Sequence, residues 1–541
     1  MTAAASTVET DGTSMVASAH RRASEAGCAI LEADGNAFDA AVAVAAALNV
    51  VEPYMSGLAG MGFATMWVAA EARVRVLDFV PPIPRSFPAG RFTSREQLLS
   101  GASAVASPGN LAGWCMLHQA YGRLPLARVM APAIALAEGG FEFSAFGVEE
   151  VTGFGPGHAA AAGTGEAFAA AFPFHGSLRE GDAVRLPLLA ATLRQVAGGG
   201  SDVLYKGALG AGIVAFLAEQ GGTLTLEDLA AVAPIWREPL AIDYRGLRIH
   251  VPPPPCEGFQ FLLALRLLEG FDIGALAPLS VEHLDLVLRA IRLAAGLRIA
   301  DNNPDEARLG ALLSDANIRR LQDQLRAGAG LQGPTEQWTS EPPPGADPGH
   351  TTSFSIADRE GNLVCITQSL GSVFGSGVAV PGTGVVLNNF LYWADVQPGS
   401  PNLARPGAPL AMCMSPSIST RNGKACLALG TPGSYGILQT QVQAMVSHLD
   451  FGLELQAAID APRARLWDGR LVEIENRVAP EVVSQLRGRG HDARAFPQAF
   501  TMRVGGMQAI ARDPLSGRLA GAADPRRNGA VVVARARRPS G

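Results

Sequence analysis

The sequence predicts a mixed fold of class α+β, which combines helices with antiparallel hairpins, and three observations support it. Runs typical of helices fill most of residues 22–48 and 107–326. Pairs of β-rich runs within 240–251, 351–369 and 414–429 are each joined by a short turn. With 541 residues, 48% of them hydrophobic and 17% charged, the chain is long and apolar enough to bury large cores.

The N-terminal segment begins with small and polar residues, 1–13, which are typical of a flexible tail. Two helices are predicted next, 22–35, which ends at its glycine, and 37–48, which is apolar on all sides and is therefore expected to be buried. The glycines of 56–63 are compatible with a phosphate-binding loop, but they lead into a strand-like run rather than a helix. We therefore expect them to allow close packing of two backbones.

The middle of the chain is mainly helical from 107 to 220, with a helix at 124–138. A Gly/Ala-rich interval at 155–180 predicts a break in this pattern and a surface excursion. A Pro-rich segment, 328–350, predicts an exposed linker that ends directly before Thr351. A precursor that cuts itself needs an exposed segment before the peptide bond that is cut. The linker would supply this segment directly before a strand that begins with Thr.

The hairpin at 351–369 turns at 358–362, where Asp, Gly and Asn supply the dihedrals of a tight reversal. Folding the two arms about this turn brings Thr351 opposite Ser369 or its neighbour. Two hydroxyl groups from distant positions therefore meet, and a slip of one residue would separate them.

Composition excludes several classes of function. A net charge of −6 provides no basic surface for nucleic acid, and no run of ~18 to 20 apolar residues predicts a membrane span. The first residues lack the pattern of a secretory signal, and the six cysteines occur singly, so we expect reduced thiols in a cytoplasmic protein. The nine histidines form no HxxxH pair, so neither a metal nor another cofactor is expected.

A glycine-rich turn, 430–436, follows the hairpin at 414–429 and opens a predicted helix at 437–448. Backbone N–H groups at the start of a helix can stabilise a negatively charged oxygen. This turn is therefore a candidate oxyanion site.

These features resemble the γ-glutamyltranspeptidase family of N-terminal-nucleophile hydrolases, over about residues 14–470. The resemblance implies a four-layer αββα fold with two stacked antiparallel sheets. It also implies a precursor that cuts itself between His350 and Thr351 into chains of 350 and 191 residues, with the large subunit at 14–350 after the tail and the small subunit at 351–541, and it leaves open a dimer of these. The stretches that carry it are Met15–His20, Gly35–Ala43, Tyr205–Gly207, Asp243–Gly246, Pro252–Pro254, Leu387–Asn389, Met414–Pro416 and Gly430–Gly433.

The resemblance assigns roles that the chemistry supports. Thr351 is the expected nucleophile, because cleavage would give it an α-amine of pKa about 7.7 to 8.0 that can act as its base. Ser369 takes the place of the second hydroxyl of the family, and the N–H groups of Gly433 and Ser434 match its oxyanion hole. An amide substrate would form an acyl-enzyme, which water or an amine resolves.

At the positions that bind the substrate in the family, this chain has different residue types. Where the family has an Arg that grips the α-carboxylate of the substrate, this chain has Val80, and Arg85 is the alternative carboxylate contact. Apolar or small residues replace further polar contacts at Gly371, Phe390, Trp393, Met412 and Cys413. A zwitterionic glutamyl group would lose its water there without gaining partners, at a cost of about a few kcal/mol. We therefore expect an amidase for small amides or apolar acyl groups.

Simpler interpretations stand beside these. Thr351 taken alone is an ordinary strand residue, and His350 is a loop histidine without a derived role. Phe390 and Trp393 can be core residues rather than pocket residues, and Cys413 can serve packing rather than reactivity. Two further function classes stay open, a true γ-glutamyl hydrolase or transpeptidase that acts on glutathione-like substrates, and a non-catalytic relative.

Overall fold

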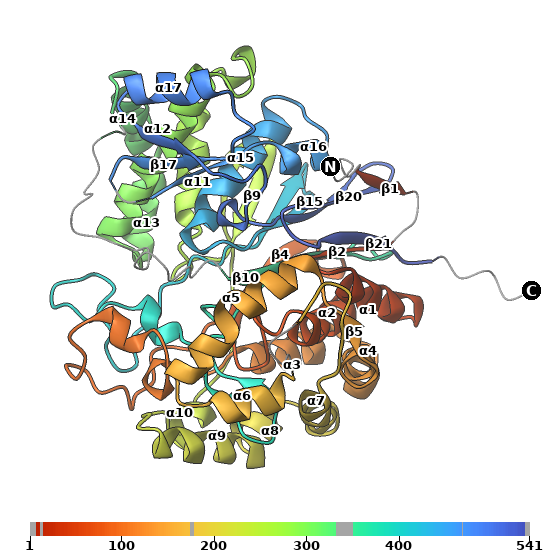
Figure 1. Cartoon of the computed structure of the whole chain (residues 1–541). Helices are drawn as coiled ribbons and strands as arrows, with labels where there is room; N and C mark the ends of the chain where they lie inside the picture. The colour runs from red at the N-terminus through yellow and green to blue at the C-terminus, as the bar shows by residue number, and fades with distance from the viewer. Residues whose placement is uncertain are drawn as a thin grey trace, which may run out of the picture.

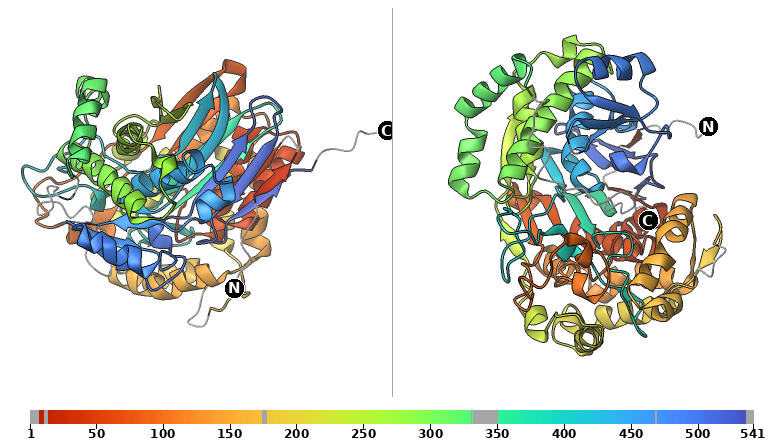
Figure 2. Two further views of the ribbon diagram at one scale, coloured as in Figure 1. Left: turned by 90° about the horizontal axis from the view of Figure 1, so that it is seen from above. Right: turned by 60° about the vertical axis from the view of Figure 1, so that its left-hand side comes forward.

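Two seven-stranded antiparallel sheets lie face to face, and helices cover both outer faces (Figures 1 and 2). This computed structural model describes residues 7–10, 14–173, 178–329, 331, 350–467 and 469–535. The arrangement confirms the predicted mixed fold and its four layers.

Sheet I carries the central hairpin. All of its neighbouring strands are antiparallel. In spatial order it consists of β21 (Ala530–Val533), β2 (Met15–Ser18), β10 (Thr351–Ala357), β11 (Leu363–Ser369), β3 (Met61–Val68), β4 (Arg73–Phe79) and β7 (Ile235–Arg237).

Sheet II is also antiparallel throughout. Both sheets combine strands from before and after position 350. The order in sheet II is β1 (Val8–Thr10), β20 (Leu519–Ala523), β19 (Gln508–Arg512), β15 (Lys424–Gly430), β14 (Ser417–Arg421), β9 (Leu247–Val251) and β8 (Leu240–Tyr244).

Three smaller sheets lie outside these two layers. They pair β5 (Phe141–Glu142) with β6 (Ala183–Val184), β12 (Ala379–Val380) with β13 (Val385–Val386), and β17 (Leu471–Ile474) with both β16 (Ala464–Leu466) and β18 (Asp492–Ala495).

The helices divide into two outer layers, drawn below and above the sheets in Figure 1. On sheet I lie α1 (Arg21–Glu32), α2 (Ala37–Val51), α3 (Asn110–Tyr121), α4 (Leu126–Gly139), α5 (Ala145–Ala161), α6 (Gly165–Ala171), α7 (Pro187–Gly199), α8 (Asp202–Tyr205), α9 (Ala208–Glu219) and α10 (Leu226–Ala230). On the side of sheet II lie α11 (Phe259–Leu268), α12 (Val281–Ala300), α13 (Glu306–Leu313), α14 (Asp315–Arg326), α15 (Ile437–Leu449), α16 (Leu455–Asp460) and α17 (Pro480–Gly488).

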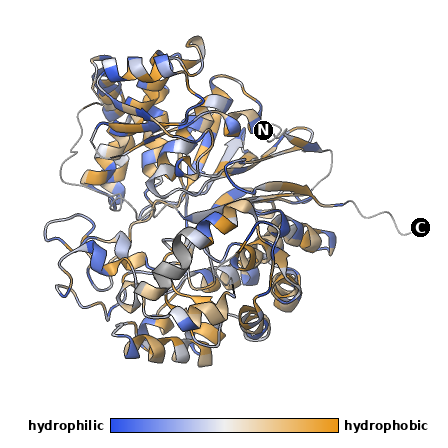
Figure 3. Cartoon of the chain, viewed as in Figure 1, coloured by the Kyte–Doolittle hydropathy of each residue, from blue (hydrophilic) through white to orange (hydrophobic). Residues whose placement is uncertain are grey.

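Side-chain alternation along the strands separates three layers of core. On β10, Phe354 and Ile356 pack against the helices that cover sheet I. Ala357 belongs to the layer between the sheets, together with Ala428 and Ile510 of sheet II. Figure 3 shows hydrophobic and hydrophilic residues mixed along the outer helices, as expected of helices with one buried face.

The predicted hairpin has the predicted turn. Gly361 has a φ of +94°, which favours glycine. The Asp358 carboxylate accepts hydrogen bonds from the N–H groups of Glu360 and Asn362 and so closes the turn. This geometry sets the register of the two arms.

The structure also confirms the predicted glycine packing. A Cβ at Gly60 would lie 2.0 Å from the carbonyl oxygen of Ser369, and one at Gly62 would lie 2.4 Å from that of Thr367. Only glycine permits such an approach, so these residues bring β3 against β11.

Two local expectations were wrong or incomplete. The interval 155–180 was expected to break the helical pattern, yet its residues up to Ala171 lie mostly in α5 and α6. Tertiary packing overrides the weak helix propensity of glycine there. The expected tail, 1–13, contains β1, which pairs with β20.

The expected linker falls almost wholly outside the described residues, because 330 and 332–349 are not described. Among the described helices, no single one is long and apolar enough to cross a membrane. One pair, Pro187–Gly199 and Asp202–Glu219, meets that test only together and is bent by 105°.

Candidate active site

Thr351 and Ser369 face each other across the first register pair of the β10–β11 hairpin. Their exposed fractions are 3% and 1%, so both hydroxyl-bearing residues are buried. The predicted pairing of the two arms is therefore confirmed, and it places two hydroxyl groups beside the peptide bond that joins His350 to Thr351.

Ser369 is oriented by hydrogen bonds on both sides. Its Oγ accepts a bond of 2.9 Å from the N–H of Gly371 and donates one of 2.7 Å to the carbonyl oxygen of His350. The φ of Gly371 is +105°, and a Cβ there would lie 2.1 Å from Oδ1 of Asn389. A side chain does not fit at position 371, so the glycine is required by the loop that directs Ser369.

Alternation along β10 sets the direction in which Thr351 faces. The Oγ of Ser355 donates to the carbonyl oxygen of Gln508 in sheet II, and a Cβ at Gly430 would lie 2.1 Å from the Oγ of Ser353. Thr351 shares this face, because side chains two residues apart along a strand lie on the same side. The hydroxyl of Thr352 faces the other way and donates to Glu52.

Sequence reasoning missed an ion pair beside the start of β10. Arg527 donates to the carbonyl oxygen of Thr351 at 2.7 Å and to the carboxylate of Glu52, also at 2.7 Å. Both side chains are almost fully buried. Burial raises the pKa of the neighbouring Tyr54 well above its usual value, and Glu52 raises it further. The sequence feature that could have indicated this ion pair is the pair of adjacent arginines at 526 and 527.

The predicted oxyanion turn has an unusual backbone. Gly433 has a φ of +126°, and Ser434 has a φ of +55°, in the left-handed region that favours glycine. Ser434 therefore adopts a backbone conformation that glycine adopts more easily, and its Oγ is buried and unpaired among the described residues.

A buried arginine orients the peptide between these two residues. Arg465 donates a hydrogen bond of 2.8 Å to the carbonyl oxygen of Gly433. In a trans peptide the carbonyl and the following N–H have opposite directions, so the N–H of Ser434 is directed away from Arg465. Among the described residues no group accepts from the N–H of Gly433 or Ser434, which leaves both available to a ligand oxygen.

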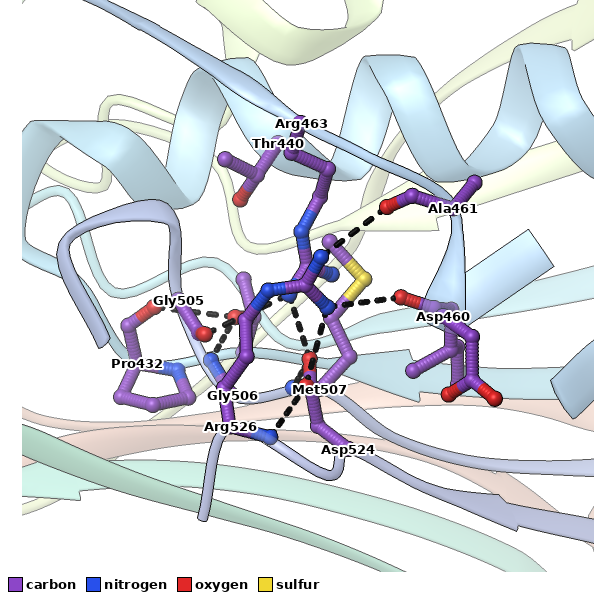
Figure 4. A network of polar contacts seen from close by, with 12 residues as sticks. Pro432, Thr440, Asp460, Ala461, Arg463, Gly505, Gly506, Met507, Asp524 and Arg526 are labelled. Atoms are coloured by element: carbon purple, nitrogen blue, oxygen red, sulfur yellow. Dashed lines mark hydrogen bonds and ion pairs between the residues drawn. The ribbon is translucent and has the colours of Figure 1, made fainter. Parts of the chain in front are cut away.

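A buried network of charges supports this turn (Figure 4). Arg463 and Arg526 both bind the carboxylate of Asp524, which also accepts from the N–H of Met507. Burial raises the pKa of Asp524, but the two guanidinium groups lower it more, so it lies below its usual value. The hydroxyl of Thr431, within the turn, accepts from the N–H of Gly506. The network thus joins the turn to the end of sheet II.

The residues expected to line an acyl pocket share one hydrophobic cluster. The rings of Trp393 and Tyr435 are tilted against each other with their centroids 5.6 Å apart, and Met412 pairs its backbone with the segment around Cys256. Burial raises the pKa of the Cys413 thiol, which favours packing over reactivity. The cluster includes Val80, Phe390, Trp393, Met412 and Cys413, all buried except the half-buried Val80.

A small polar cavity adjoins this cluster. Its volume is about 20 Å³, enough for about one water molecule. Arg298 lies at its wall, forms a buried ion pair with Glu257 at 2.9 Å, and stacks over Tyr435 at 4.1 Å. Phe390 and Trp393 are 1% and 6% exposed, which fits the simpler interpretation that they are core residues, although Trp393 also borders this cavity.

Arg85, the alternative carboxylate contact, is exposed to solvent and is not buried with this cluster. Its backbone N–H donates to Asp228. The described residues contain no group of three or more His, Cys, Asp or Glu side chains that could hold a metal ion. All six cysteines are free, in agreement with the expected reduced thiols, and all six are buried.

Comparisons with known proteins cover nearly the whole chain. The family model "Gamma-glutamyltranspeptidase" matches residues 23–534. The chain is 35% identical to "Acylase ACY 1 proenzyme" of Pseudomonas sp. (strain SE83), over 96% of this chain and 93% of that protein. It is 31% identical to "Glutathione hydrolase proenzyme" of Bacillus subtilis (strain 168), over 96% and 91%. The solved structure of cephalosporin acylase from Bacillus halodurans is 30% identical, covers 98% of this chain and 97% of its own, and has a TM-score of 0.86.

Proposed function

Because the chain belongs to the γ-glutamyltranspeptidase family of N-terminal-nucleophile hydrolases, we propose that Thr351 is the nucleophile of an amidase that prefers apolar acyl groups. The chain is a self-processing enzyme of the amidohydrolase and acyltransferase type. The proposal concerns which residues perform the reaction and which amides they cleave.

One observation carries the assignment of the nucleophile. The peptide bond between His350 and Thr351 lies between two residues that are 4% and 3% exposed, and Ser369 donates to its carbonyl oxygen. An external protease cannot reach a bond buried in this way. A hydroxyl on the adjacent residue can reach it, which supports self-cleavage at this position.

The self-cleavage follows from these groups. The Oγ of Thr351 attacks the carbonyl carbon of His350, and Ser369 stabilises the developing oxyanion through the hydrogen bond that it already donates. The C–N bond then breaks, the nitrogen of Thr351 takes a proton, and an ester joins His350 to the Thr351 oxygen. Water hydrolyses the ester, which leaves a carboxylate on His350 and a free α-amine on Thr351.

The free α-amine serves as the base in turnover. In its neutral form it removes the proton of the Thr351 hydroxyl, which attacks the carbonyl carbon of the substrate amide. The N–H groups of Gly433 and Ser434 stabilise the oxyanion, and the released amine takes the proton. Water or a second amine then cleaves the acyl-enzyme ester and regenerates the hydroxyl.

The two fragments stay associated after cleavage. Sheet I places β10 between β2, which precedes the cut, and β11, which follows it, so backbone hydrogen bonds join the fragments. We therefore propose a mature enzyme of two subunits, 1–350 and 351–541, that share both sheets. The free cysteines support our proposal that it works in the cytoplasm, where thiols stay reduced.

Apolar acyl specificity rests on the cluster around Trp393. Apolar side chains occupy Val80, Phe390 and Met412, where a γ-glutamyl enzyme has polar contacts. A relative named as an acylase, 35% identical, supports an acyl specificity other than γ-glutamyl. The glutathione hydrolase relative, 31% identical, supports the second candidate, a γ-glutamyl hydrolase or transpeptidase.

A panel of anilides that share one leaving group separates the two candidates. The cut enzyme should hydrolyse straight-chain and aromatic acyl anilides with a kcat/KM at least roughly tenfold above that for the γ-glutamyl anilide. A preference for the γ-glutamyl anilide would establish the second candidate instead. The Thr351→Ala variant is the control for background hydrolysis, and added glycylglycine as an amine acceptor distinguishes transfer from hydrolysis.

A further inference from the structure

His350, the residue before the proposed cleavage point, is held by its side chain as well as by its carbonyl group. Its Nε2 lies 2.8 Å from Oε2 of Glu150, on α5. The two side chains are 5% and 9% exposed, so the pair is shielded from solvent. An electrostatic contact in such surroundings is stronger than one at the surface.

The face of α5 that carries Glu150 packs directly on the candidate active site. Phe146, four residues earlier and therefore on the same face, lies edge-on to Tyr54 at 6.2 Å and under the guanidinium of Arg527 at 5.3 Å. A Cβ at Gly147 would lie 2.9 Å from the hydroxyl of Tyr54. Phe146, Gly147 and Glu150 of this helix therefore all contact residues around the bond between His350 and Thr351.

We propose that Glu150 is a positioning residue for self-cleavage, which holds the His350 imidazole so that the carbonyl group of His350 stays on Ser369 and beside Thr351. The inference rests on the proposed self-cleavage and extends it to a helix about 200 residues earlier in the chain. Glu150 touches none of the reacting atoms and acts only through His350.

Two attachments define the orientation of the scissile peptide. Ser369 binds the carbonyl oxygen of His350, and Glu150 binds its side chain, on the other side of the same Cα. With one attachment, the carbonyl group can rotate about the remaining bonds of the residue. With both, the carbonyl carbon stays in reach of the Thr351 hydroxyl, and loss of about 1 Å of alignment can slow a reaction by roughly 10²-fold.

The first experiment measures the rate of cutting. Freshly refolded precursor is sampled over time, and the uncut chain and its two fragments are resolved on denaturing gels. Glu150→Gln keeps the shape of the side chain but removes its charge, and it should slow cutting by roughly 10- to 100-fold. Glu149→Gln is the matched control, because Glu149 lies one residue earlier on the same helix and is exposed. It should cut at the rate of the natural chain.

The second experiment tests whether Glu150 acts through His350. His350→Gln should slow cutting to a similar extent, and the double variant Glu150→Gln/His350→Gln should be no slower than the slower single variant. His350→Lys, which presents an N–H donor and a positive charge to Glu150, should cut faster than His350→Gln. A general loss of structure in α5 would not produce this coupling.

Clear outcomes would overturn the inference. Normal cutting by Glu150→Gln would refute it, and so would a double variant in which the two effects multiply. Failure of the proposed function is distinguishable, because cutting by Thr351→Ala would refute the nucleophile itself, whatever the behaviour of Glu150. Circular dichroism of each variant identifies any that fail to fold, and the rescue by His350→Lys then decides the case.

Discussion

The hydroxyl of Ser369 donates a hydrogen bond of 2.7 Å to the carbonyl oxygen of His350. Ser369→Ala removes this donor from the carbonyl group on which negative charge would develop, so cutting should slow by roughly 10²-fold. The measurement is the time course of fragment formation after refolding. Ser353→Ala is the matched control, because it removes a buried hydroxyl of the same hairpin that bonds to Ile366 instead. Equal rates for the two variants would contradict the proposed role.

Thr351 should be required for both cutting and turnover. Thr351→Ala should remain a single chain and hydrolyse no anilide, whereas Thr351→Ser retains a hydroxyl and should still cut. Intact mass shows whether fragments ending at 350 and beginning at 351 form. Thr352→Ala is the control, because its hydroxyl lies on the opposite face and bonds to Glu52, and this variant should cut. Fragments from Thr351→Ala would sink the nucleophile assignment.

Ser434 should tolerate replacement by glycine. Its φ of +55° is unfavourable for a residue with a Cβ, and its buried hydroxyl has no hydrogen-bond partner among the described residues. Ser434→Gly should therefore leave turnover within about twofold and raise the free energy of unfolding by up to about 1 kcal/mol. Urea unfolding of the Thr351→Ala chain, which stays uncut, measures the latter. Ser434→Val should lose stability and activity, and a gain in stability by valine would contradict the strain.

The buried pair of Glu52 and Arg527 should matter for stability. Glu52→Gln leaves the Arg527 guanidinium buried without its counter-ion, so the free energy of unfolding should fall by about 3 kcal/mol. Glu238→Gln is the control, because its ion pair with Arg73 is exposed and should contribute less than about 0.5 kcal/mol. Urea unfolding of uncut chains measures both. A loss below 1 kcal/mol for Glu52→Gln would show that the pair is not needed for folding.

His283 should make the fold sensitive to acid. Burial lowers its pKa from 6.5 to about 4, and its Nδ1 accepts a hydrogen bond from the N–H of Leu279, which only the unprotonated atom can do. A histidine that is harder to protonate in the fold than in the unfolded chain stabilises the fold above pH 6.5. This contribution is lost as the pH falls from 6.5 to 4, by about 3 kcal/mol.

The variant His283→Asn tests this pH dependence. An asparagine oxygen can accept from Leu279 but does not titrate, so the variant should be less stable than the natural chain at pH 7 and lose less stability between pH 6.5 and 4. Urea unfolding at a series of pH values measures the difference. Parallel pH curves for the two proteins would contradict the assignment.

The sequence by itself determined the central hairpin and the elements that depend on neighbours in the chain. The turn at 358–362 set the register that pairs Thr351 with Ser369, and the glycines at 60 and 62 predicted close backbone contact. The interval 155–180 was the exception, because its glycines predicted a break and tertiary packing keeps much of it helical. Turn dihedrals and side-chain alternation are local, so a single sequence reveals them.

Only the tertiary structure decided which charged groups hold the site together. Glu52 and Arg527 are separated by 475 positions, yet they meet beside the start of β10. Arg465 orients the oxyanion turn, and Glu150 meets His350, through contacts that no local pattern encodes. Buried charges require partners, but any of many acidic or basic residues could satisfy them in a sequence, and only the packing of two sheets and two helical layers selects one.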